Sequence, residues 1–388
     1  MIYLDNSATT KMRKEATDKY LSVADECFGN PSSLHAMGLA AEKELDAARR
    51  RILATLDDKA SSVVFVGSGS EANNLAILGR AYAKERYRRG ARIITTEGEH
   101  ASVEQPLMRL ADEGYEIVKI PTRGGAIDLD ALRSALTKST ILVTVMMVNN
   151  ETGALYDIAA VSALVKDLAP DAVLHVDATQ SYLKLPFTKK SIGADMITLS
   201  SHKIEGPKGV GALIIDPLVI KNKGICARIL GGGQEMGLRS GTENVPAIAA
   251  FGAAAELGKK ELSASFKKMS EMREYLIEKL STLPDFEAVV PTLPVSHAPH
   301  ILNVTVAGIK SETLLHCLSR DGVYVSSGSA CSSNTNHLSS ALIAYGKTPE
   351  EADSSIRISL SARNTYEELD AALEALAKAI KQLVRIKR

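Results

Sequence analysis

The chain has 388 residues, and its 46 lysine and arginine residues balance 46 aspartate and glutamate residues. This length exceeds one ordinary hydrophobic core, so we expect two domains, or one large α/β domain with a smaller companion. The zero net charge gives no sign of a nucleic acid or an acidic surface as the main partner. No apolar run reaches the roughly 18–20 residues that a membrane span needs.

The four cysteines, Cys27, Cys226, Cys317 and Cys331, are widely scattered. They have neither the density of a disulfide scaffold nor the paired spacing of a metal site. The first residues, Met-Ile-Tyr-Leu-Asp, do not resemble a signal peptide. We therefore expect a soluble cytoplasmic protein with reduced thiols, no bound metal and no membrane attachment.

Short β-branched runs alternate with amphipathic helical patterns over the first 215 residues. The predicted strands cover residues 62–66, 91–95, 116–120, 140–148, 173–176, 196–199 and 210–215. The predicted helices between them include residues 71–86, 129–136 and 158–168. Several strands are nearly all apolar and the order is repeatedly strand then helix, so we predict a mainly parallel sheet with helices on both faces.

A long alanine-rich helix is predicted over residues 245–280, with no strand to interrupt it. A second region follows, with strands near 288–290, 301–306 and 323–325 and a last amphipathic helix over 367–386. Because no low-complexity linker separates the two regions, we expect the domain boundary within the long helix.

Residues 67–74, Gly-Ser-Gly-Ser-Glu-Ala-Asn-Asn, follow a predicted strand and open a helix. Small residues at this point let backbone N–H groups and the Ser70 hydroxyl approach an anion at the helix N-terminus. An ordinary strand–helix turn with a serine cap is the alternative. The segment matches neither GxxxxGK[ST] nor GxGxxG, which disfavours a nucleotide site.

Asp177 and Lys203 each follow a buried strand. A carboxylate at such a strand end needs donors or a cation, so Asp177 is either a helix cap or the counter-ion of a bound cationic group. A desolvated lysine can lose its proton and condense with an aldehyde. Lys208 could compete for this role, but it lies inside a glycine-rich turn, and we favour Lys203. A Schiff-base lysine, an aspartate for the pyridine nitrogen and an anion site together suit pyridoxal 5′-phosphate (PLP).

Cys331 lies in a run of small polar residues, 326–336. Structural cysteines usually have apolar neighbours, whereas this setting favours a loop. A single loop cysteine is more often incidental than reactive, so the segment alone decides nothing.

Nearly the whole chain, from residues 3–10 to residues 355–359, resembles the cysteine desulfurases of the NifS/IscS group, within the class-V aminotransferase-like PLP enzymes. The matching segments between these ends are GNPSSLH at 29–35, EH at 99–100, NNETG at 149–153, HVDATQ at 175–180, SSHK at 200–203, GGGQE at 231–235, RSGTEN at 239–244 and SSGSAC at 326–331. Their order and spacing make the resemblance specific.

The resemblance implies an α/β fold, the PLP-dependent transferase fold type I. A mainly parallel sheet would form a large PLP-binding domain over residues 16–255. Residues 1–15 and 256–388 would form a smaller α+β domain that carries the cysteine loop.

The resemblance also implies a role for each matching residue. Lys203 would bind the cofactor covalently, and Asp177 would contact its pyridinium nitrogen. Gln180 and Asn150 would lie at its phenolic oxygen. His100 would stack on its ring and assist proton transfer. Gly69, Ser70, Ser200 and His202 would hold the phosphate, together with Thr242 from the second subunit of a homodimer. Arg357, helped by Asn30, would bind the substrate carboxylate, and Cys331 would be the nucleophile.

The implied reaction removes sulfur from L-cysteine, giving L-alanine and a persulfide on Cys331. The sulfur would pass to an acceptor protein for iron–sulfur cluster assembly, tRNA thiolation or another thio-cofactor pathway. Ser70 stands where the family usually has threonine, but it keeps a hydroxyl, so phosphate binding should survive. The polar run after Cys331 and the C-terminus differ from the scaffold-contacting segments of relatives, so the acceptor stays open. Another class-V activity, selenocysteine lysis or amino transfer, is the main alternative; a non-catalytic sulfur-relay protein is a further one.

Overall fold

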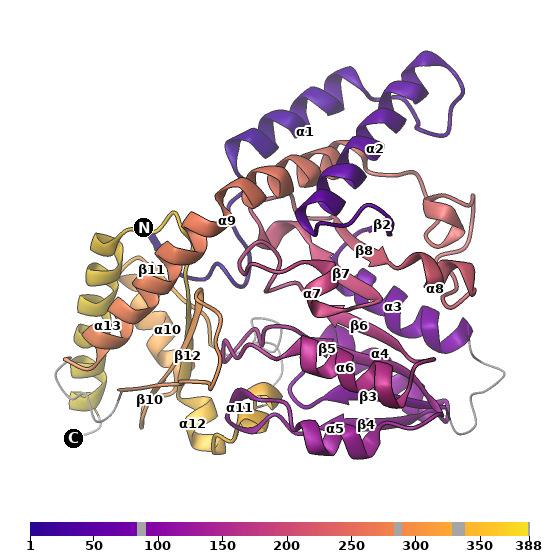
Figure 1. The fold of residues 1–388 in the computed structure, drawn as a ribbon. Helices are drawn as coiled ribbons and strands as arrows, with labels where there is room; N and C mark the ends of the chain where they lie inside the picture. The colour runs from indigo at the N-terminus through magenta and orange to yellow at the C-terminus, as the bar shows by residue number, and fades with distance from the viewer. Residues whose placement is uncertain (84–90, 283–288, 328–337, 387–388) are drawn as a thin grey trace.

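A computed structural model describes residues 1–83, 91–282, 289–327 and 338–386 (Figure 1). Its largest element is a seven-stranded sheet with the order β2-β8-β7-β6-β5-β3-β4. The strands are β2 (Ser62–Val66), β3 (Arg92–Thr96), β4 (Glu116–Ile120), β5 (Thr140–Met146), β6 (Val173–Asp177), β7 (Met196–Ser200) and β8 (Gly211–Ile215). Strands β4, β3, β5, β6 and β7 pair in parallel, which confirms the prediction of a mainly parallel sheet.

Strand β8 is the exception, because it pairs antiparallel with both β7 and β2. Parallel neighbours need a crossover of a dozen or more residues, usually a helix. The connection from β7 to β8 is shorter than that and holds only a single turn of 3₁₀ helix, η3 (Ser201–Lys203), before a glycine-rich turn. The chain therefore reverses directly, and this reversal carries Lys203.

Alternate residues of the strands face two different helical layers, as strand geometry requires. Val64 and Val66 of β2 pack with the cluster that includes α3 and α4, whereas Val63 and Phe65 pack with the cluster that includes α2, α6 and α9. The helices of this region are α1 (Lys14–Glu26), α2 (Ala36–Thr55), α3 (Gly69–Ala83), α4 (Ala101–Asp112), α5 (Leu129–Ala135), α6 (Ile158–Leu168), α7 (Lys189–Ile192), α8 (Pro217–Lys221) and α9 (Val245–Leu280). Both faces of the sheet are thus covered.

A second region lies at the far end of α9 (Figure 1). Its antiparallel sheet has the order β12-β10-β9, and a short parallel pair joins β1 to β11. The elements are β1 (Ile2–Tyr3), β9 (Val289–Pro291), β10 (Ile301–Val306), α10 (Ser311–Arg320), β11 (Val323–Tyr324), α11 (Ser340–Tyr345), α12 (Pro349–Asp353), β12 (Ser355–Ser359) and α13 (Tyr366–Ile386).

Helix α9 belongs to two hydrophobic clusters. Its first turns, up to Ala255, pack with the large sheet, and its last turns, from Met269, pack with β10, β12 and α13. Leu4, from the N-terminal segment, also lies in the second cluster. The division into residues 16–255 and residues 1–15 with 256–388 stays a prediction.

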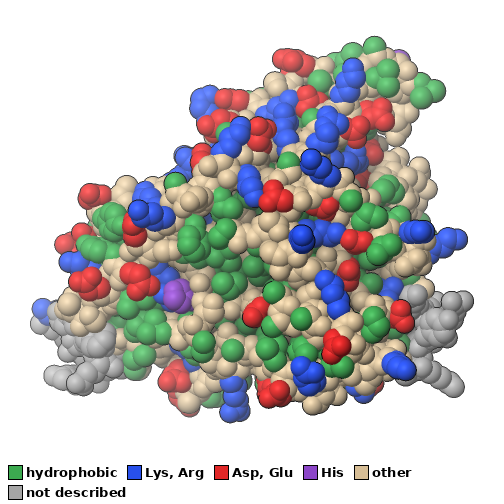
Figure 2. Space-filling view, viewed as in Figure 1, with side chains coloured by type: hydrophobic (Ala, Val, Ile, Leu, Met, Phe, Trp, Pro, Cys, Tyr) green, Lys and Arg blue, Asp and Glu red, His purple; other side chains and the backbone are tan. Residues whose placement is uncertain are grey.

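The surface in view carries acidic and basic side chains in alternation rather than one extended field of either sign (Figure 2). In the described part of the chain, no helix combines the length and the apolar character that a membrane span requires.

Candidate functional site

A pocket of about 220 Å³ lies where the carboxyl ends of β6 and β7 meet the N-terminus of α3. This is the edge at which open parallel sheets bind their ligands. The predicted site residues that line it are Gly69, Ser70, His100, Asn150, Asp177, Gln180, Ser200, His202, Lys203 and Arg357. The structure therefore gathers residues from five of the sequence motifs and from β12 around one cavity.

Three predicted residues are not in this group. Asn30 is exposed, and its Oδ1 accepts a hydrogen bond from the Ser32 backbone N–H at 2.9 Å. Thr242 is also exposed and does not line the pocket of its own chain. Cys331 lies outside the described residues, so its role stays a prediction.

The described residues that flank the Cys331 segment are both fixed beside the pocket. Ser326 pairs with Arg357 through two backbone hydrogen bonds of 3.1 and 2.7 Å. On the other side, Ser339 Oγ donates to Glu151 Oε2 at 2.5 Å, next to the pocket-lining Asn150.

Lys203 ends the short helix η3 and extends its amine into the pocket. Its Nζ donates to the backbone carbonyls of Ser7 at 2.5 Å and Ala8 at 2.9 Å. Lys208, the competing lysine, is exposed and does not line the cavity. The geometry therefore favours Lys203 as the reactive lysine.

Asp177 closes β6 with a carboxylate that is only 6% exposed. Oδ1 accepts from the Thr179 backbone N–H at 2.9 Å, in a turn. Oδ2 accepts from Asn73 Nδ2 at 2.8 Å. No helix directly follows Asp177, so the helix-cap alternative is wrong: one oxygen stabilises a turn while the carboxylate faces the pocket.

His100 caps the N-terminus of α4 with its Nδ1 atom, which accepts from the Ser102 backbone N–H at 3.1 Å. Ser102 Oγ lies 2.8 Å from the same nitrogen. Asn73 Nδ2 donates to Ser102 Oγ at 2.8 Å, so the serine O–H is left to donate to His100. Two donors on Nδ1 fix the neutral imidazole with its proton on Nε2.

Burial lowers the pKa of His100, with the charge of Asp177 opposing and that of Lys203 adding to the shift. The neutral ring therefore offers a donor at Nε2. Sequence reasoning missed Asn73 and Ser102, which also line the pocket. Ser102 carried a local signal, because a hydroxyl two residues after a helix N-cap can bond back to the cap; Asn73 carried none.

Gly69 begins α3 close to the ends of two strands. A Cβ at this position would lie 3.2 Å from Ser200 Cβ and 3.3 Å from Thr179 Oγ1. Glycine therefore lets the helix N-terminus meet the hydroxyls of Ser70 and Ser200 in the pocket wall. The serine cap is present as well, because Ser68 Oγ accepts from the Glu71 backbone N–H at 3.1 Å. The arrangement is suited to holding an anion, and we call it the anion cradle.

His202 borders the same cradle, and its Nδ1 lies 3.1 Å from Thr9 Oγ1. Burial, helped by the charges of Lys203 and Lys208, lowers the pKa of His202 to about 4. At neutral pH this side chain is uncharged and can donate one hydrogen bond to an anion.

Arg357 sits in the middle of β12 with 2% of its surface exposed. Its Nη1 donates to the Asn150 carbonyl at 2.8 Å and its Nη2 to Asp5 Oδ1 at 2.9 Å. Nε is buried without a hydrogen-bond partner among the described residues. A buried, unpaired donor on a guanidinium fork suits a carboxylate ligand.

The Aminotransferase class-V family matches residues 2–372 of the chain. The chain belongs to this family. Cysteine desulfurase IscS 1 of Archaeoglobus fulgidus is 36% identical over 386 residues, which cover 99% of this chain and 98% of the relative. The resemblance to the NifS/IscS group that the motifs predicted is confirmed.

Solved structures of similar proteins confirm the predicted fold. A NifS-like protein superimposes with a TM-score of 0.90 at 33% identity, covering 98% of this chain and 99% of the other. The structure of SspA in complex with cysteine gives a TM-score of 0.80 at 29% identity, covering 94% and 100%. The α/β architecture with a mainly parallel sheet is that of fold type I.

Proposed function

We propose that this protein is a PLP-dependent cysteine desulfurase that converts L-cysteine to L-alanine and leaves the sulfur as a persulfide on Cys331. The pocket carries the proposal, because it joins an amine, a buried carboxylate, an anion cradle and a carboxylate-binding arginine in one cavity. The likeness to IscS-type relatives and to a protein solved with cysteine supports it.

The residues of the pocket fit PLP. Lys203 would hold its aldehyde carbon, Asp177 its ring nitrogen, and the cradle at Gly69 its phosphate. A side chain at position 69 would crowd Ser200 and Thr179, so glycine leaves room beside them for a phosphate. When bound, the cofactor withdraws electrons from the substrate's Cα and weakens its bonds.

The chain's own residues then have distinct tasks. Arg357 holds the substrate carboxylate with its unpaired Nε. The Lys203 amine takes the Cα proton, with the Ser7 and Ala8 carbonyls as its resting partners. His100 presents an N–H at Nε2, which makes it a proton donor in the neutral state.

Cys331 performs the sulfur transfer as a thiolate. A sulfur–sulfur bond forms between Cys331 and the substrate while the carbon–sulfur bond breaks. The electron pair of the broken bond stays with the substrate carbon, which gains a proton and becomes the methyl group of alanine. The positions of Ser326 and Ser339 beside the pocket support this, because both flank the Cys331 segment.

The test uses purified, PLP-loaded protein with L-cysteine and a thiol reductant. We expect equal amounts of alanine and sulfide, and a fall of about 100-fold or more in Lys203→Ala and Cys331→Ala. Cys317→Ala removes a half-buried free thiol from α10 and serves as the matched control, with activity unchanged. Amino transfer to a keto acid that survives Cys331→Ala would instead favour an aminotransferase.

We also propose a cytoplasmic homodimer in which Thr242 of each subunit completes the phosphate site of the other. The exposure of Thr242, and of Leu230 (84%) and Met236 (56%) in the same stretch of chain, supports a covered surface there. The acceptor is an iron–sulfur scaffold or a tRNA-thiolation protein. Capture of proteins that receive ³⁵S from the persulfide form separates these pathways.

A further inference from the structure

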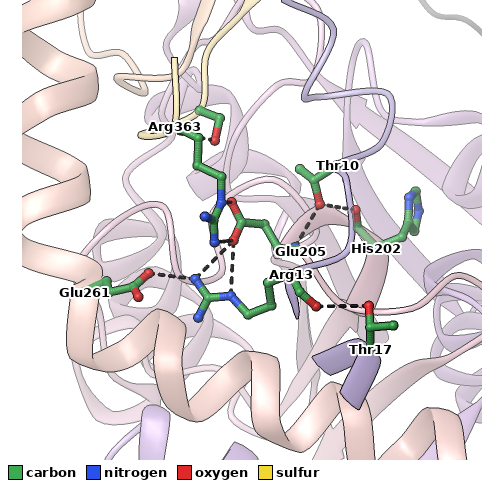
Figure 3. Close-up of polar contacts among 8 residues, drawn as sticks. Thr10, Arg13, Thr17, His202, Glu205, Glu261 and Arg363 are labelled. Carbon is green, nitrogen blue, oxygen red and sulfur yellow. Dashed lines mark hydrogen bonds and ion pairs between the residues drawn. The ribbon is translucent and has the colours of Figure 1, made fainter. Parts of the chain in front are cut away.

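The Glu205 carboxylate binds two arginines at once (Figure 3). Arg13 donates from Nε at 3.1 Å and from Nη2 at 3.0 Å to Oε2. Arg363 donates from Nε to Oε1 and from Nη2 to Oε2, both at 2.7 Å. Glu261 of α9 receives Arg13 Nη2 at 2.6 Å. We call Glu205, Arg13, Arg363 and Glu261 the Glu205 clamp.

The clamp joins segments that are far apart in the chain. Glu205 follows Lys203 by two residues in the β7–β8 reversal. Arg13 directly precedes α1, and Arg363 lies just beyond β12, the strand that carries Arg357. The Glu205 carboxylate therefore links two segments: the end of β12, which carries Arg357, and the β7–β8 reversal, which carries Lys203.

The backbone around Glu205 is fixed as well. Its N–H donates to Thr10 Oγ1 at 2.8 Å, and Thr10 Oγ1 donates to the His202 carbonyl at 2.8 Å. Glu205 has a φ of 62°, in the left-handed region that residues with a side chain rarely adopt. Contacts on its backbone and its side chain hold this conformation in place.

Charge and burial favour a permanently ionised clamp. Burial alone would raise the pKa of Glu205, but the hydrogen bond and charge of Arg363, with the charges of Arg13 and Lys184, outweigh it and lower the pKa. The Arg13 side chain is 4% exposed and that of Glu205 13%, whereas Arg363 is 60% exposed. Arg363 is thus the one arginine of the pair that can be changed with little loss of buried contact.

We infer that Glu205 is a positioning residue that sets β12, and with it Arg357, against the Lys203 turn, so that substrate carboxylate and reactive lysine keep a fixed separation. The role of Arg357 and Lys203 in this statement rests on the proposed function. The physical link between the two segments does not, and it can be measured without any turnover.

The test compares wild type, Arg363→Gln, Arg363→Lys, Glu205→Gln and Lys378→Gln. Lys378→Gln is the matched control, because it breaks another ion pair, to Asp321, in which the lysine is 56% exposed. Hydrogen–deuterium exchange is followed in the peptide with residues 198–208. We expect exchange there to rise about threefold or more in Arg363→Gln and Glu205→Gln, less in Arg363→Lys, and not in Lys378→Gln.

Binding provides a second arm. Arg363→Gln should weaken the binding of L-cysteine, seen as a rise of about threefold or more in KM. The affinities for PLP and for cysteamine, which has no carboxylate, should stay unchanged. The inference would be overturned if hydrogen–deuterium exchange in Arg363→Gln equalled that of the wild type. It would also be overturned if this variant bound cysteine and cysteamine with equally reduced affinity. If the wild type neither binds PLP nor forms alanine, the proposed function fails, and the exchange result still decides the clamp.

Discussion

At the residue scale, the orientation of His100 depends on two uncharged side chains, those of Asn73 and Ser102. The Asn73 amide donates one hydrogen bond to Asp177 and one to Ser102. The Ser102 hydroxyl in turn donates to His100 Nδ1. The carboxylate and the imidazole of the pocket are therefore parts of one hydrogen-bonded chain. The donor and acceptor of each hydrogen bond follow from Asp177, because an ionised carboxylate can only accept hydrogen bonds.

Ser102→Ala should release the Nδ1 atom of His100 from one of its two donors. We expect a mixture of Nδ1–H and Nε2–H tautomers where the wild type has only the second. We also expect a loss of about tenfold in kcat, because the proton donation proposed for His100 needs Nε2–H. The ¹⁵N chemical shifts of labelled histidine report the tautomer. Ser102→Thr keeps the hydroxyl and should behave as wild type. Identical ¹⁵N shifts in Ser102→Ala and wild type would refute the assignment.

At the element scale, the start of α3 is built for close approach to the strand ends. Gly69→Ala places a methyl group 3.2 Å from Ser200 Cβ, inside the anion cradle. We expect PLP affinity to fall about tenfold, while stability changes little because alanine favours a helix by up to about 1 kcal/mol over glycine. Equilibrium dialysis and urea unfolding measure the two quantities. Gly258→Ala, in α9 against the flexible Leu183 side chain, is the control that should leave PLP binding intact.

Many elements could be predicted because their signals are local. The bounds predicted for strands 62–66, 116–120 and 301–306 and for helix 245–280 agree with the structure. The antiparallel direction of β8 was not predicted, because it depends on a connection too short for a crossover helix. The pocket residues that follow strands were predicted from their position, whereas Asn73 was missed because its partners lie on other elements.

At the scale of the whole molecule, stability should depend on pH through buried histidines. His175 is fully buried, and its ring lies between Thr144 Oγ1 at 2.8 Å and Thr198 Oγ1 at 3.0 Å. Burial lowers the pKa of His175 to about 4, below its usual 6.5. The unfolded chain therefore binds the proton more tightly, and this contribution is complete above about pH 6.5 and lost as pH falls towards 4.

His175→Gln keeps polar contacts but removes this titration. Between about pH 7 and pH 5 the wild type should lose about 2 kcal/mol more unfolding free energy than the variant. The comparison is made between the two proteins because burial raises the pKa of Glu99 to about 8, which acts in the opposite direction in both. Urea unfolding of the protein without added cofactor gives the values. Parallel pH profiles would mean that His175 does not carry the effect.

The N-terminal segment has a consequence for how the molecule is made. Ile2 pairs with Val323, Asp5 binds Arg357, and Arg13 binds Glu205. Residues at this end leave the ribosome early, but the segments that they contact follow 192 to 352 positions later. The large sheet can therefore form during synthesis before Val323 and Arg357, which contact the start of the chain, have been made. A pocket that includes Arg357 can be completed only when translation has nearly ended.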